Sequence, residues 1–132
     1  MRTTVRDLLD AIRGHVDQFE LPELYSVHVI TAPGEPRVSA QLAAHQPPQI
    51  AIGLLAWAST LSHVTAEAWC EPGGQAVHLS VTGQLAGGVT IRVYGALPVT
   101  PRGIGADLAS NTSAPVPLTA LRHFATPKEV IS

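Results

Sequence analysis

Apolar residues recur at helical spacing near the start of the chain, at Val5, Leu8, Leu9, Ile12, Val16 and Phe19. Spacings of three and four residues place these side chains along one side of an α-helix. Thr4, with Asp7 three residues later, is typical of a capped helix start. We therefore predict an amphipathic helix that runs to about Glu20. Its solvent side is expected to carry the charged residues of the segment, Arg6, Asp10, Arg13 and Asp17.

Polar and apolar residues alternate with a period of two in five later segments, 25–31, 37–42, 64–70, 75–85 and 89–97. Such alternation is typical of strands with one buried face. The short sequences APGEP, EPGG and AGG between them favour hairpin turns. Between the second and third of these segments, PPQIAIGLLAWA begins with prolines and repeats apolar residues at helical spacing, which predicts a second helix.

The resulting order, α-β-β-α-β-β-β, predicts an α+β fold of two layers, with one antiparallel sheet of about five strands and the helices packed on one face. We expect a single domain over residues 1–125, a loop-rich stretch at 98–117, a short helix at 117–125 and a frayed tail over 126–132. The predicted buried face consists of the apolar members of each alternation, Val27, Val29, Val38, Ala40, Leu42, Ala66, Ala68, Val77, Leu79, Val81, Val89, Ile91 and Val93.

The polar members of the same strands form a second face, which carries the candidate site. Successive residues of a strand point to opposite sides of the sheet, so the outward positions can be read from the sequence. The predicted binding face comprises His28, Arg37, Glu67, Trp69, His78, Ser80, Arg92 and Tyr94. An aromatic cluster with a polar rim is typical of the centre of a protein interface, so we expect a non-catalytic module that binds a partner or a second copy of itself through this face. Cover of the same residues by the tail after Pro98 is the other interpretation.

Composition favours association with another protein. Charged residues are 14% of the 132 residues and hydrophobic residues 45%, so the surface is unusually neutral. We expect a protein partner or a homo-oligomer, with a dimer as the first expectation. Cys70 is the single cysteine, so no intrachain disulfide is expected. No apolar block resembles a signal peptide or a membrane span, which predicts a cytoplasmic protein without membrane contact.

Nucleic-acid binding is the main alternative for the same face. Trp69 and Tyr94 could stack on bases while Arg37 and Arg92 contact phosphates. The formal net charge of -2 and the absence of an aromatic-rich RNA-binding run make single-stranded nucleic acid the second choice.

A small enzyme or ligand-binding domain that uses His28, Glu67 and His78 is the third and weakest choice. The six histidines are spaced widely and form no tight ligand pairs. Ser80 lies in mid-strand, away from any oxyanion-binding turn, and Cys70 falls in the inward phase of its strand. PRGIGADL lacks the third glycine of a dinucleotide-binding loop. We predict no catalytic residue, no metal and no cofactor.

Three segments, LPELYSVHVIT, LLAWASTL and VHLSVTGQLAGGVTIRVYG, carry a resemblance to other proteins. Over roughly residues 5–97 the chain resembles small actinobacterial proteins, several of them associated with plasmids, prophages or related mobile elements, which have no assigned function. The resemblance implies a cytoplasmic accessory protein and brings no site residues with it.

Overall fold

The computed structural model describes residues 3–31, 37–44, 46–99 and 108–125. Within these ranges the elements follow the order α1 (Val5–Gln18), β1 (Leu24–Ile30), β2 (Arg37–Leu42), α2 (Pro47–Ala58), β3 (Ser62–Cys70), β4 (Ala76–Gln84), the 3-10 turn η1 (Ala86–Gly88), β5 (Thr90–Pro98), β6 (Ser113–Pro115) and α3 (Leu118–Ala125). The predicted class, helices combined with a largely antiparallel sheet, is confirmed. The helix expected at 117–125 is present as α3.

The strands form one six-stranded sheet in the order β1-β2-β5-β4-β3-β6. The predicted antiparallel sheet of about five strands differs from the observed sheet in two details, because β2 pairs with β5 in parallel and β6 adds a strand beside β3. Alternation shows which face a residue takes, but it does not show which strand lies next to it. β6 has only three residues and includes a proline, so its sequence carries no strand pattern.

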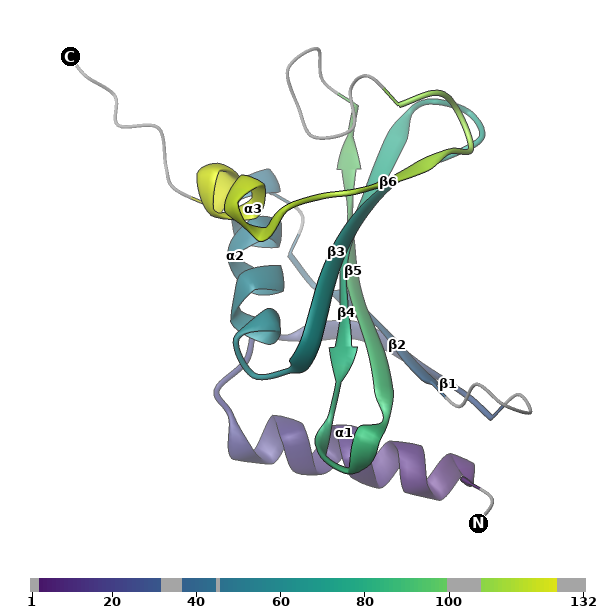
Figure 1. The fold of residues 1–132 in the computed structure, drawn as a ribbon, viewed down its shortest axis with the longest axis vertical. Helices are drawn as coiled ribbons and strands as arrows, with labels where there is room; N and C mark the ends of the chain where they lie inside the picture. The colour runs from purple at the N-terminus through teal and green to yellow at the C-terminus, as the bar shows by residue number, and fades with distance from the viewer. Residues whose placement is uncertain (1–2, 32–36, 45, 100–107, 126–132) are drawn as a thin grey trace, which may run out of the picture.

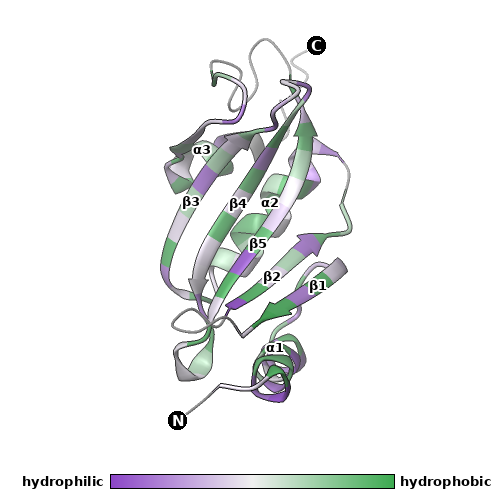
Figure 2. Ribbon diagram, turned by 90° about the vertical axis from the view of Figure 1, so that its right-hand side faces the viewer, coloured by the Kyte–Doolittle hydropathy of each residue, from purple (hydrophilic) through white to green (hydrophobic). Residues whose placement is uncertain are grey.

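The helices cover one side of the sheet (Figure 1). α2 contacts β4 and β5, and α3 packs on α2. α1 lies below them and contacts β1, β2 and η1. Figure 2 looks onto the other side, where no described helix or strand lies in front of the sheet. The outer face of β3, β4 and β5 is therefore uncovered by the part of the chain that the structure describes.

The core lies between the sheet and the helices. Most of the predicted inward residues are buried, namely Val38, Ala40, Leu42, Ala66, Ala68, Val77, Leu79, Val81, Ile91 and Val93. Trp57 of α2 is fully buried. Two glycines allow α2 to approach the sheet closely: a Cβ on Gly95 would lie 2.7 Å from Ile50 Cγ2, and one on Gly53 would lie 3.0 Å from Leu42 Cδ1.

The first helix begins as its sequence predicts. The Thr4 hydroxyl accepts a hydrogen bond from the Asp7 backbone N–H at 3.1 Å, and the Asp7 carboxylate accepts one from the Thr4 N–H at 2.9 Å. These reciprocal bonds satisfy two N–H groups that a helix start otherwise leaves without partners. They also hold the pKa of Asp7 below its ordinary value.

The burial prediction is wrong for Val27, which is 40% exposed, while Val29 and Val89 are partly buried. Val27 does face inward, since it pairs with the buried Ala40. However, β1 is the edge strand of the sheet, and α1 leaves a groove beside it instead of covering it. Periodicity assigns the face of a strand but not the extent of the layer that covers it.

Some sequence predictions fall on residues outside the ranges that the structure describes. The turn APGEP, most of the PRGIGADL segment and the predicted frayed tail over 126–132 lie outside the described residues. β1 and β2 nevertheless pair as the predicted antiparallel hairpin. Among the described helices, none is long and apolar enough to cross a membrane.

Candidate functional site: an aromatic row on the outer face

Three aromatic side chains from three neighbouring strands meet on the uncovered face of the sheet. Trp69 of β3 lies directly opposite His78 of β4. Tyr94 of β5 lies opposite Ser80, one outward position along β4 from His78. The predicted adjacency of these residues is therefore present. We call Trp69, His78 and Tyr94 the aromatic row.

The rings of the aromatic row contact one another. The His78 and Tyr94 rings are nearly parallel, with an interplanar angle of 7° and 5.6 Å between centroids. Trp69 meets His78 edge to face, at 86° and 5.1 Å. The Arg92 guanidinium carbon lies 5.7 Å from the centroid of Tyr94, within the range of a cation–π contact. The Tyr94 hydroxyl also lies 3.5 Å from Gln41 Oε1, to which it donates.

Glu71 holds the central ring of the row and was not part of the predicted site. Its Oε1 lies 2.6 Å from His78 Nε2. Because a carboxylate only accepts hydrogen bonds, Nε2 carries the proton in this contact. In the sequence, Glu71 is the first residue of the EPGG turn, which explains its presence without any site. Glu71 follows Trp69 by two residues, so the alternation of β3 places it on the outward side as well. This spacing is the sequence feature that could have included Glu71 in the predicted site.

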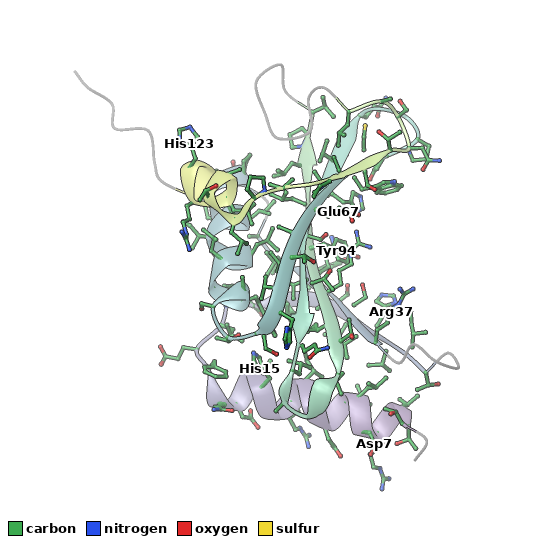
Figure 3. All side chains as sticks on the ribbon, in the orientation of Figure 1. Asp7, His15, Arg37, Glu67, Tyr94 and His123 are labelled. Carbon is green, nitrogen blue, oxygen red and sulfur yellow. The ribbon has the colours of Figure 1, made fainter. Side chains whose placement is uncertain are left out.

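A polar hollow of about 350 Å³ lies beside the aromatic row, on β3, β4 and β5 next to the short strand β6. Its lining is mostly polar or small, Thr65, Ala66, Glu67, Ser80, Thr82, Arg92, Ser113, Ala114 and Pro115. Glu67 is exposed, and Figure 3 shows it with Tyr94 and Arg37 on the side of the sheet away from α2. The hollow gives the row a rim with both signs of charge.

Ser80 was predicted on the binding face and lies at this hollow, but only 2% of it is exposed. Its side chain is buried, and its hydroxyl donates to the Glu67 backbone carbonyl at 3.5 Å. Its partners on the adjacent strands are Glu67 of β3 and Tyr94 of β5. This burial also leaves the hydroxyl inaccessible as a nucleophile.

His28 and Arg37 belong to the same face but lie away from the aromatic row. His28 is on the edge strand β1, and two strands, β2 and β5, separate it from His78 on β4. With strands about 4.8 Å apart, three steps across the sheet amount to roughly 14 Å. His28, Glu67 and His78 therefore do not come together, and no other trio of His, Cys, Asp or Glu in the described residues is close enough to hold a metal ion.

Two further titratable groups lie on the inward side. His15 of α1 is buried, and its ring stacks on Trp57 with 5.6 Å between centroids. Its Nε2 lies 2.7 Å from the Thr60 hydroxyl, which itself donates to the Trp57 carbonyl. Burial lowers the pKa of His15 below its ordinary value of 6.5. Cys70 is buried as predicted.

Comparisons with protein-family models, with curated proteins and with solved structures give no match. The resemblance to proteins of mobile elements therefore stays a prediction. What the outer face can do must be inferred from its geometry.

Proposed function

We propose that this chain is a non-catalytic binding module that holds a partner protein on the outer face of its sheet, with the aromatic row at the centre of the contact. The observation that carries the proposal is the open position of Trp69, His78 and Tyr94. Each ring is only partly buried, and no described element covers them. Aromatic side chains that are already held in place lose little conformational entropy on binding, and they are enriched among the residues that dominate interface energies.

The contacts within the row favour a protein over a nucleic acid. Base stacking needs a free ring face. Here the His78 ring is stacked on Tyr94 and meets Trp69 edge to face, and Tyr94 also contacts Arg92. Two of the three rings, His78 and Tyr94, therefore already use a ring face within the row, which leaves less free ring face for base stacking.

The charges around the row agree with this choice. Glu67 and Glu71 lie beside it together with Arg92, so a phosphate backbone laid across the row would meet two carboxylates. A protein surface with mixed charges would instead complement this rim, which supplies specificity in protein interfaces. The proposed partner therefore has an apolar centre surrounded by both acidic and basic side chains.

Site-specific crosslinking tests the proposal. A photoreactive phenylalanine analogue replaces Trp69 in one variant, Tyr94 in a second and exposed Ile52 of α2 in a control. We expect the first two variants to crosslink in cells to the same protein, and the control not to. The purified partner should then bind wild type with a Kd that Trp69→Ala raises about 30-fold or more, the effect of losing an interface hot spot.

Two outcomes would contradict the proposal. One is a set of crosslinks that does not distinguish the row from Ile52. The other is salt-sensitive binding of single-stranded oligonucleotides that Trp69→Ala or Tyr94→Ala abolishes, which would make the face a nucleic-acid platform.

A further inference from the structure

A second surface, on the inward side of the edge strand, is apolar and open. A groove of about 680 Å³ runs between α1 and β1. Its apolar lining comes from Val5, Leu9, Ile12 and Val16 of α1 and from Leu24 and Val27 of β1. Four of these side chains are large and exposed, Val5 at 47%, Leu9 at 48%, Val16 at 43% and Val27 at 40%. Exposed apolar side chains gathered in this way mark interaction surfaces.

A row of charged side chains borders this groove along α1. Arg6, Asp10, Arg13 and Asp17 are spaced by four, three and four residues, which places them in one line along the helix. All four are exposed, and Arg6, Asp10 and Arg13 line the groove. None of the four forms an ion pair with another described residue. The row reads plus, minus, plus, minus from the start of the helix to its end.

Four charges that alternate in sign begin with one sign and end with the other. Such a row is therefore complementary to an identical row that runs in the opposite direction. If a second α1 lies alongside the first in the opposite direction, with a twofold axis between Asp10 and Arg13, then Arg6 faces Asp17 of the second copy. Asp10 then faces Arg13 of the second copy, so all four contacts across the axis join opposite charges. A parallel arrangement would place like charges opposite one another.

The apolar residues fit the same axis. Reversal about their own midpoint sets Val5 against Val16 of the second copy, and exposed Leu9 against position 12, where Ile12 is buried in its own chain at 7% exposure. This midpoint is one residue from that of the charged row, so about a single twofold axis the facing residues of the two rows differ in register by two residues, about 3 Å along the helix. An offset of less than one helical turn allows one twofold axis to serve both rows, as an interface between identical surfaces requires.

From these observations we propose that the groove is the self-association surface of the chain, and that its occupant is a second copy whose α1 lies antiparallel to the first. The exposed apolar side chains supply the buried area, and the charges determine direction and register. This inference does not depend on the proposed function, because Trp69, His78 and Tyr94 lie on the opposite face of the sheet from Val27.

The first test is the mass of the full chain in solution. We expect light scattering and sedimentation equilibrium at roughly 5–200 micromolar, concentrations suited to micromolar affinity, to give a dimer for wild type. Leu9→Lys should raise the dimer dissociation constant at least about tenfold, the effect of placing an unpaired charge in an apolar contact. Ile52→Lys is the matched control, since Ile52 is 49% exposed but lies on α2 outside the groove, and it should remain dimeric.

A charge-exchange pair gives a second test that leaves the apolar residues intact. Arg6→Glu with Arg13→Glu makes the row wholly acidic, and Asp10→Lys with Asp17→Lys makes it wholly basic. Each double variant should be mainly monomeric alone, and an equimolar mixture should form a one-to-one heterodimer.

Several results would overturn the inference. One is a wild-type chain that remains monomeric over this concentration range. Another is a dimer that Leu9→Lys leaves unchanged while circular dichroism shows that the variant stays helical. A third is a mixture of the two charge variants that does not associate. Dissociation of the dimer by Trp69→Ala with Tyr94→Ala, but not by Leu9→Lys, would assign self-association to the outer face instead. If the chain forms the dimer but positions 69 and 94 crosslink to no partner, the result would contradict the proposed function and leave this inference standing.

Discussion

The rings of His78 and Tyr94 stack on each other although the two residues are diagonal neighbours in the sheet. His78 lies opposite Ala96, and Tyr94 lies opposite Ser80. The diagonal distance is within reach of aromatic side chains. Because the residue opposite His78 is the small Ala96, the Tyr94 ring has room to reach across to the His78 ring.

This stacking predicts an energetic coupling between the two residues. In a double-mutant cycle of His78→Ala, Tyr94→Ala and the combined variant, we expect a coupling of about 0.5–1.5 kcal/mol in the free energy of unfolding. Urea denaturation of the four proteins gives the value. Additive effects within experimental error would show that the rings stabilise the fold independently.

The two tryptophans differ in access to solvent, which predicts separate fluorescence behaviour. Trp57 is fully buried and Trp69 is only partly buried. Iodide should therefore quench wild-type emission partly, and Trp69→Phe should remove most of this quenching while leaving the blue-shifted emission of Trp57. Quenching of similar extent in Trp69→Phe and wild type would show that Trp69 is covered. Both proteins should be quenched equally once unfolded in guanidinium.

Burial of His15 predicts that stability decreases with acidification. Its folded pKa is lowered below 6.5, so the unfolded chain binds a proton more readily than the folded chain does. The contribution of neutral His15 is complete above about pH 6.5 and is lost as the pH falls from there through the lowered folded pKa. In this window the free energy of unfolding should fall by at most about 1.4 kcal/mol per pH unit from this group.

His15→Phe provides the control for this pH dependence. Phenylalanine retains an aromatic ring beside Trp57, and the Thr60 hydroxyl keeps its bond to the Trp57 carbonyl. Urea denaturation between about pH 5 and pH 8, on either side of the ordinary histidine pKa, should give a flatter stability curve for the variant. Parallel curves for the two proteins would mean that His15 does not contribute to the pH dependence.

Two glycines should respond in opposite directions to the same substitution. Gly95→Ala would place a methyl group 2.7 Å from Ile50 Cγ2, so we expect a loss of about 1–3 kcal/mol in the free energy of unfolding. Gly14→Ala should instead stabilise the chain by about 0.5–1 kcal/mol, because Gly14 lies inside α1 and nothing lies within 4 Å of the place that its new methyl group would take. Thermal and urea denaturation of both variants measures the difference. A neutral Gly95→Ala would show that α2 can move away from β5 at little cost.

Much of the local structure could be predicted from the sequence. β2 has the predicted bounds, Arg37–Leu42, and Thr4 caps α1 with Asp7. The aromatic row followed from two local features, the period of two along β3, β4 and β5 and the short glycine-containing turns that join them. Consecutive hairpins leave little freedom in which strands become neighbours.

The remaining features depend on distant parts of the chain. Val27 is exposed because α1 leaves a groove beside β1, and Ser80 is buried between Glu67 of β3 and Tyr94 of β5. The contact of Glu71 with His78 crosses the EPGG turn. The residues of this turn are already explained by the hairpin that they form, so they did not indicate a side-chain contact. In each case alternation gave the correct direction of the side chain, but what lies above it is determined by tertiary packing.

The parallel pairing of β2 with β5 also determines the order in which the sheet can be completed during synthesis. Arg37 pairs with Thr90, so β2 leaves the ribosome about 50 residues ahead of the strand it needs. At about 5–20 residues per second the delay is roughly 3–10 seconds, far longer than a hairpin takes to form. During that time the β1–β2 hairpin has both edges unpaired, and a nascent neighbour could pair with either of them. The free edge of β2 therefore stays unpaired until β5 has been synthesised, and β1 remains an edge strand in the finished sheet.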